Sequence, residues 1–433
     1  MTLEAVWAYF VLMLVVMGAA ALPFFRFLDD ESEQGTRYSS VDGLRGFLAL
    51  GVFVFHLVIT RGFIETGVWG VPGSRFYALL GPIGVSVFFM LTGFLFWGKL
   101  LRARGRPRWR ALYIGRLFRI APMYLTVVIV MLCIVFARTG FELHEPATAV
   151  AGSVLQWLAL GLIDTQPDVN AYQATHLLAG VTWTISYEWA FYASLMAIAP
   201  FARRRAHLMF VLAALALCLA AKILWRIDAL GFAVLFLSGM TVASLLHEKM
   251  LPRLSNTAAS GIALLCLVTL FLTSRSGYGA WPAMLLAGFF YLVCSGTSLF
   301  GLLGSSAAQR LGRISYSLYL MQGLVLTVVF AAGPIRTFAM TSPQAYWATG
   351  IACACLLLLC AALGYAFIER PGIALGKQLI RRVDRSASAA SPIASNHAGF
   401  IAPAPSDESG SLGGSAATVL PLSTVKVVAV NAT

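Results

Sequence analysis

Charged residues are scarce in this sequence of 433 residues. They make up 11% of the chain, whereas about a quarter of the residues in a typical soluble domain are charged. Hydrophobic residues make up 59%, and they occur in long runs that a water-soluble fold cannot bury. Because a lipid core offers no hydrogen-bond partner to an open backbone, we predict that the chain crosses a membrane as α-helices.

The sequence also lacks the cysteine pattern of a metal site or of a disulfide framework. All seven cysteines lie inside apolar runs, so we expect packing roles and no metal. The formal net charge of +13 would suit a nucleic acid partner. We exclude that partner because the basic residues cluster in short segments between apolar runs, which is typical of membrane topology.

About eleven apolar runs are present, each near the roughly 20 residues that one helix needs to cross a bilayer. We therefore predict an all-α, polytopic transmembrane helical bundle. A further run, Val150–Ile163, is short and predicts an interfacial or re-entrant segment. The predicted spans are Val6–Phe27, Gly43–Phe63, Phe76–Trp97, Ile114–Phe136, Val181–Pro200, His207–Trp225, Leu230–Leu246, Ala258–Thr273, Trp281–Leu299, Ile314–Ala332 and Tyr346–Phe367.

The basic residues predict the orientation of these helices. The clusters Lys99–Arg110, Arg203–Arg205, Arg310–Arg313 and Arg370–Arg385 all fall on one side of the predicted membrane, which the positive-inside rule assigns to the cytoplasm. We therefore expect a multi-pass protein of the plasma (inner) membrane with a cytoplasmic C-terminus. Residues 386–433 are rich in Ser, Ala, Gly and Pro, and this composition predicts a disordered tail.

Arg45 and His56 share the second apolar run. They are eleven residues apart, which is close to three helical turns and about 16 Å along the axis. We expect both side chains on one stripe, with Arg45 at the cytoplasmic mouth and His56 deep in the membrane, lining one continuous cavity. Ionisable groups at such depth are costly and usually functional, so His56 is a candidate general acid or base. The alternative is a packed histidine that is hydrogen-bonded to a neighbour.

Glu188 is the second candidate, because it lies roughly 10 Å from the outer end of its apolar run. His56 lies at a similar depth, so we expect the carboxylate to orient or charge-stabilise the imidazole. The alternative is a structural glutamate bonded to Tyr or Trp on another helix.

Arg116 and Arg119 are three residues apart and therefore share one helix face at the predicted cytoplasmic boundary. Two guanidinium groups at such a place suit a diphosphate or a nucleotide phosphate. The alternative is contact with lipid headgroups, together with a role in setting topology.

Six segments along the chain carry a family resemblance. They are Asp42-Gly43-Leu44-Arg45-Gly46 with His56; Gly84-Val85-Ser86-Val87-Phe88-Phe89 with Thr92-Gly93-Phe94-Leu95; Arg116 and Arg119 with Pro122 and Tyr124; Trp183-Thr184 through Glu188 with Phe191-Tyr192; Leu311 through Leu320; and Ile368-Glu369-Arg370-Pro371. Together, in this order, they resemble the acyltransferase-3 family of integral-membrane O-acyltransferases. The likeness runs from about Tyr38 to Pro371.

The resemblance implies a core of ten helices, so Val6–Phe27 is expected to be an extra one. The expected organisation is an extra transmembrane helix with a cytoplasmic linker (1–36), an acyltransferase-3 transmembrane domain (37–385) and the tail. Two departures occur: Gln322 stands where many members have His, and Thr92 where Ser is usual.

The resemblance also implies chemistry. Acyl-CoA, with acetyl-CoA expected, would be the cytoplasmic donor substrate, and Arg45, Arg116 and Arg119 would bind its phosphates. His56, assisted by Glu188, would deprotonate the acceptor hydroxyl or relay the acyl group. The acceptor would be a glycan or a lipid-linked molecule reached from the membrane or the outer side.

Two other classes of protein fit the same sequence. A transporter or flippase also buries His, Glu and Arg along a substrate path, although no inverted repeat is apparent. A membrane receptor or assembly scaffold would not need these residues.

Overall fold

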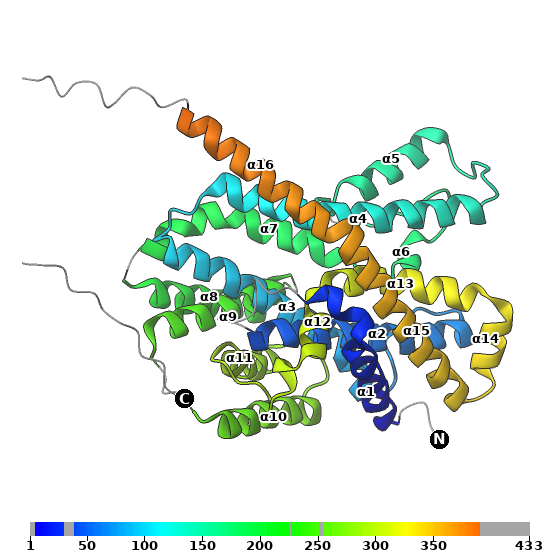
Figure 1. Ribbon diagram of the computed structural model, residues 1–433, viewed down its shortest axis with the longest axis horizontal. Coiled ribbons are helices and arrows are strands. Elements are labelled where there is room, and N and C mark those ends of the chain that lie inside the picture. Colours follow the sequence, from blue (N-terminus) through cyan, green and yellow to red (C-terminus); the bar gives the residue numbers. More distant parts are fainter. Residues whose placement is uncertain are drawn as a thin grey trace, which may run out of the picture. The chain divides into compact units, whose positions relative to one another are not determined.

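The structure is a computed structural model that describes residues 5–29, 39–163, 165–203, 205–225, 227, 229–250 and 254–389. This part of the chain is helical and contains no strand, as the sequence predicted (Figure 1). Its α-helices are α1 (Trp7–Ala21), α2 (Ser39–Thr66), α3 (Arg75–Arg102), α4 (Trp109–Arg138), α5 (Ala147–Leu158), α6 (Ala174–Leu177), α7 (Trp183–Ile198), α8 (His207–Trp225), α9 (Leu230–Glu248), α10 (Asn256–Thr273), α11 (Ala280–Cys294), α12 (Ser306–Arg313), α13 (Ser315–Ala331), α14 (Gly333–Met340), α15 (Pro343–Gly364) and α16 (Arg370–Ala389).

Within the described residues, seven helices are long and apolar enough to cross a membrane: α2, α3, α4, α8, α9, α10 and the continuous helix Pro343–Arg385, which includes α15. An eighth span is formed if α12 and α13 count as one, although the chain bends by 70° between them. α1 and α11 have 15 residues each, and α7 has 16. The membrane-spanning helical bundle is thus supported, whereas the total of eleven spans stays a prediction. α5, in the predicted interfacial segment, has 12 residues and is too short to span.

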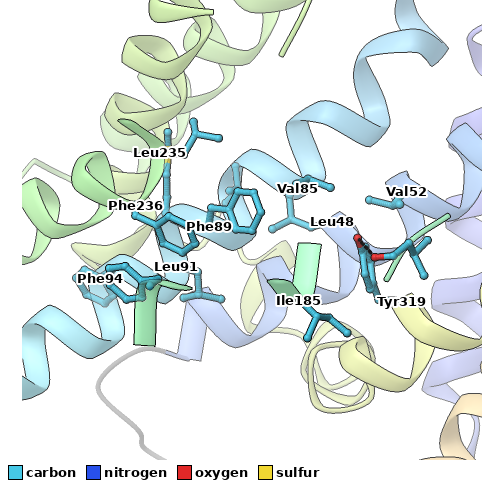
Figure 2. Packing of buried hydrophobic residues seen from close by; sticks show 14 of the residues in the cluster. Leu48, Val52, Val85, Phe89, Leu91, Phe94, Ile185, Leu235, Phe236 and Tyr319 are labelled. Atoms are coloured by element: carbon cyan, nitrogen blue, oxygen red, sulfur yellow. Dashed lines mark hydrogen bonds between the residues drawn. The ribbon is translucent and has the colours of Figure 1, made fainter. Parts of the chain in front are cut away.

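The interior of the bundle is built around α2 and α3. α2 packs against α3, α12 and α13, and α3 packs against α9. Two glycines allow the close crossing of α3 and α9: a methyl group on Gly93 would overlap the carbonyl oxygen of Phe236, and one on Gly239 would overlap that of Met90. Phe89 and Phe236 lie side by side at this crossing, with ring centroids 4.8 Å apart (Figure 2).

α12 joins the N-terminal helix to the bundle through Arg310. The buried guanidinium group donates two hydrogen bonds of 2.8 Å to the carboxylate of Asp29. It donates a third, also of 2.8 Å, to the carbonyl oxygen of Ala20 in the last turn of α1. These bonds to the charged form hold the pKa of Asp29 below its usual range. The carboxyl end of α1, whose carbonyls lack helical partners, is therefore bound to α12 by polar contacts.

A π-helical turn, Tyr365–Glu369, joins α15 to α16 (orange in Figure 1). Such turns are frequent at functional sites, and the side chain of Glu369 is fully buried here. A second unit begins at Asp384, of which the structure describes only the last residues of α16. Most of the predicted tail (390–433) and most of the predicted linker (30–36) lie outside the described residues.

Candidate active site

A cavity of about 260 Å³ lies between α2, α3, α4, α7 and α13. Four of the predicted site residues line it: Arg45, Arg116, Arg119 and Glu188. They converge because α2 and α4, which carry the arginines, both pack against α13. The remaining wall is mostly aromatic and aliphatic, so the polar groups are concentrated on one part of the surface. A mainly apolar pocket with a few convergent polar groups is the usual form of a small-molecule site.

The arginines keep donors available for a ligand. Arg45 lies 3.7 Å from a carboxylate oxygen of Asp42, and Arg119 lies 3.6 Å from Oε1 of Glu369. Both separations are longer than a hydrogen bond, so each pair leaves N–H groups uncommitted. Arg116 places its guanidinium group 4.9 Å above the ring of Phe96, a cation–π contact, and it also interacts with the hydroxyl group of Tyr192.

Glu369 is the buried counter-charge of this arginine group. Its Oε2 accepts a hydrogen bond of 2.8 Å from Ser317, whereas its Oε1 has no hydrogen-bond partner and faces Arg119. The Oγ of Ser315, which lines the cavity, is also buried and unpartnered. Buried polar atoms without partners are rare, so their presence beside the arginines is consistent with a ligand site.

Glu188 belongs to the arginine cavity and not to His56. Its Oε2 accepts a hydrogen bond of 2.6 Å from Tyr192, one turn later on α7. The expected pairing of Glu188 with His56 is therefore absent: the described contacts of the imidazole are to other residues. Equal depth along two helices does not decide which neighbours face each other, and this is why depth alone misplaced the pair.

Tyr319 lines the cavity and also contacts the surroundings of His56, because its carbonyl oxygen accepts a hydrogen bond from Gln322. Its hydroxyl group lies 3.1 Å from the carbonyl oxygen of Val181 and 3.2 Å from Oγ1 of Thr184, and its ring centroid lies 6.1 Å from that of Phe88. Figure 2 shows the Tyr319 ring beside Val52, which precedes His56 by one helical turn. A layer of packed side chains, formed by Tyr319, Phe88 and Thr184, thus lies in the wall of the cavity.

His56 is buried but does not line the cavity, which corrects the expectation that it and Arg45 share one continuous space. The spacing of the two residues predicted one common stripe of α2, but a common stripe does not decide whether the space beside it is open or is filled by neighbouring helices. The imidazole Nδ1 lies 3.0 Å from the carbonyl oxygen of Val52 and 3.4 Å from Oε1 of Gln322.

Aromatic rings cover His56 on its other side. The ring of Trp69, in the α2–α3 loop, lies 6.5 Å from the imidazole and is nearly parallel to it. Trp69 also stacks on His176 of α6, with centroids 4.9 Å apart, and Phe63 lies 5.3 Å from His176. His56 is 8% exposed, and we call its surroundings, formed by Val52, Gln322 and Trp69, the His56 compartment.

Sequence reasoning missed three contributors to these two places: Glu369, Tyr192 and Gln322. Glu369 lies in a segment that carried the family resemblance, but no periodicity connected it with α4. Tyr192 follows Glu188 by four residues, a helical spacing that would have indicated the hydrogen bond. Gln322 was noted only as a departure from the family pattern.

One group of metal-ligating side chains occurs elsewhere in the described residues. The ligand atoms of His207, His247 and Glu248 lie within 4.8 Å of one another. His207 is already bonded on both ring nitrogens, to Glu248 at 2.8 Å and to Ser244 at 3.1 Å. The group lies where α8 begins and α9 ends, and none of its members lines the arginine cavity.

Comparison with known proteins defines the class first. A family model described as an acyltransferase domain, acyltransferase-3, matches residues 38–366, which is most of the chain. A membrane-type helical bundle and a match of this length define a membrane acyltransferase. The chain belongs to the acyltransferase-3 family.

One curated relative matches only part of the chain. Acyltransferase MdmB of Streptomyces mycarofaciens is 33% identical over 160 residues, which are 36% of this chain and 38% of the relative. The chain thus matches well under half the length of that relative. No solved structure matches.

Proposed function

We propose that this protein is an O-acyltransferase that moves an acyl group from acyl-CoA, with acetyl-CoA as the expected donor, to a hydroxyl group of a glycan or a lipid-linked acceptor. The observation that carries the proposal is the convergence of Arg45, Arg116 and Arg119 in one cavity, together with a buried histidine, His56, farther along the helix that carries Arg45. A class of substrate that combines several phosphates with a long, thin reactive arm fits both features.

The arginine end of the cavity would bind the phosphates of the donor. Three guanidinium groups lie there with two carboxylates of the interior, Glu188 and Glu369, while the third nearby carboxylate, that of Asp42, is 40% exposed to solvent. Planar guanidinium forks bind phosphate oxygens through paired hydrogen bonds, and the low-polarity walls strengthen them. The orientation predicted from the basic loops places this end at the cytoplasmic side, where acyl-CoA is present.

The pantetheine arm would extend from the phosphates past Tyr319 toward His56. The rise of about 16 Å between Arg45 and His56 along α2 is comparable with the reach of such an arm. Because the Tyr319 layer lines the cavity and His56 does not, arrival of the thioester requires Tyr319 and Phe88 to move aside. Closure of the layer at other times would exclude water from the thioester.

His56 would act as the general base of the transfer. Its imidazole would take the proton of the acceptor hydroxyl while the hydroxyl oxygen attacks the thioester carbonyl carbon. The C–O bond forms, the C–S bond breaks, and the proton passes from the imidazolium to the leaving thiolate. The products are the acyl ester and free CoA, and the histidine returns to its neutral state.

The acceptor would approach His56 from the side of Trp69 and His176, opposite to the donor. Aromatic rings at this side suit the apolar faces of sugar rings, which favours a glycan acceptor. In the predicted orientation this is the extracytoplasmic side of the plasma membrane, and the C-terminus is cytoplasmic.

Release of CoA by the purified full-length protein in lipid nanodiscs tests the proposal. Acetyl-CoA is supplied with candidate glycans, free thiol is measured, and the glycans are analysed for an added ester mass. We expect thiol release that depends on both substrates and that stops in His56→Ala. Transport of a labelled glycan into vesicles, without any thiol release, would instead favour the flippase alternative. Mass spectrometry of surface glycans from a deletion strain would identify the acceptor.

A further inference from the structure

Gln322 is a buried polar side chain to which the proposed reaction assigns no role. It lies on α13, one turn after Tyr319, and it is completely buried. A buried amide must have its hydrogen-bonding groups satisfied, and the partners that satisfy it also fix which way it faces.

The amide of Gln322 is oriented by the backbone. Its Nε2 donates a hydrogen bond of 2.9 Å to the carbonyl oxygen of Tyr319, which leaves Oε1 facing Nδ1 of His56 at 3.4 Å. The carbonyl oxygen of Val52 faces the same Nδ1 at 3.0 Å. Two acceptor oxygens therefore face the same nitrogen, Nδ1, of the neutral imidazole.

Two acceptors at Nδ1 decide where the single proton of the neutral ring resides. A proton on Nδ1 forms hydrogen bonds with both oxygens, whereas an unprotonated Nδ1 would direct its lone pair at them. Nε2 is then unprotonated. A general base needs this form, because only a nitrogen with a free lone pair can accept the proton of the acceptor hydroxyl.

Val52 alone is a weak determinant of the tautomer. Its carbonyl oxygen also accepts the backbone N–H of His56, as in any α-helix, and free histidine favours the proton on Nε2. The second acceptor on α13 adds to Val52 and ties the choice of tautomer to the packing of α2 against α13.

We propose that Gln322 is the positioning residue of His56: it holds the proton on Nδ1, so that Nε2 is the atom that accepts the proton of the acceptor hydroxyl. This rests on the proposed function for its catalytic consequence, but the tautomer itself can be observed without turnover.

The experiment compares Gln322→Met, which keeps the size but removes the acceptor, with Gln322→Glu, which keeps an acceptor oxygen at the same place. Gln156→Met, on α5 and away from His56, controls for the loss of an amide. Each full-length protein is labelled with ¹⁵N-histidine in nanodiscs, and the His56 signals are assigned by their loss in His56→Gln. Turnover with acetyl-CoA and kcat and KM for the donor are measured on the same samples.

We expect the Nδ1–H form in the wild type, in Gln322→Glu and in Gln156→Met, and a mixture of both tautomers in Gln322→Met. In Gln322→Met, kcat should fall about tenfold while the donor KM stays within about twofold. An unchanged tautomer in Gln322→Met, or an Nε2–H form in the wild type, would overturn the proposal whatever the activity.

A changed tautomer with unchanged kcat would also overturn the role proposed for Gln322. The measured turnover would still support the proposed acyltransferase function. Failure of the wild type to release CoA with any acceptor would refute the proposed function, and with it the catalytic consequence drawn for Gln322.

Discussion

The arginine cavity and the His56 compartment are neighbours with opposite character. The cavity holds Arg45 and Arg119, whose carboxylate partners lie beyond hydrogen-bond distance, and unpartnered buried atoms occur at Ser315 in its wall and at Glu369 beside Arg119. His56 is enclosed by aromatic rings and has both acceptors it needs. The first region has spare binding capacity, and the second is organised before any substrate arrives. In the proposed function, this difference would separate donor recognition at the arginines from proton transfer at His56.

The largest loss of activity is expected from a substitution in the His56 compartment. His56→Ala should lower kcat by about 10²–10⁴-fold, the usual contribution of a general base, with the donor Kd nearly unchanged. Thiol release by the purified protein measures the rate, and binding of CoA measures the cavity separately. His144→Ala, in an exposed loop, is the matched control. Full turnover in a well-folded His56→Ala protein would refute the base assignment.

The next largest effect is expected from a substitution in the arginine cavity. Arg116→Ala should weaken binding of CoA by about 10–150-fold, since a hydrogen bond to a charged group contributes about 1.5–3 kcal/mol. Isothermal titration with CoA checks this, and the ¹⁵N signals of His56 should not change. Arg106→Ala removes an exposed arginine outside the cavity and should bind CoA normally. Unchanged affinity in Arg116→Ala would contradict the phosphate role.

Tyr319→Ala should open a connection between the arginine cavity and the His56 compartment. Removing the ring opens the layer in the cavity wall, so water can reach the thioester. We expect CoA release without an acceptor to rise about tenfold, because exclusion of water prevents this side reaction. Tyr319→Phe keeps the ring and should stay near the wild-type rate. Equal hydrolysis by Tyr319→Ala and the wild type would mean that this layer does not protect the donor.

The smallest effect is expected from a substitution that changes the net charge beside the cavity. Glu369→Gln keeps an acceptor for Ser317 and removes the negative charge beside Arg119. We expect CoA to bind about threefold more tightly at low salt, with a smaller gain at high salt. Glu65→Gln, which removes an exposed carboxylate paired with Arg61, should leave CoA binding unchanged. Weaker binding in Glu369→Gln would show that the carboxylate chiefly orients Arg119.

The sequence was sufficient to predict what depends on local periodicity. The apolar runs indicated the helices, and the spacing of Arg116 and Arg119 indicated their common face. Contacts that depend on tertiary packing could not be predicted from the sequence. The contact of Glu369 with α4 depends on a π-helical turn. The contact of Gln322 with His56 depends on how α13 packs against α2. The bend of 70° before α13 was also not predicted, because the predicted span began at Ile314 and no helix was predicted for Ser306–Arg313.

The hydrogen bonds of Arg310 mean that the region shared with the family is not the smallest unit that can be expected to fold. The family match begins at residue 38, yet Arg310 lies inside it and bonds to Asp29 and Ala20 outside it. A chain trimmed to the match would lose both partners and uncover the apolar faces of α12 and α15 that α1 now contacts. Shortened versions for biochemical work should therefore begin before α1.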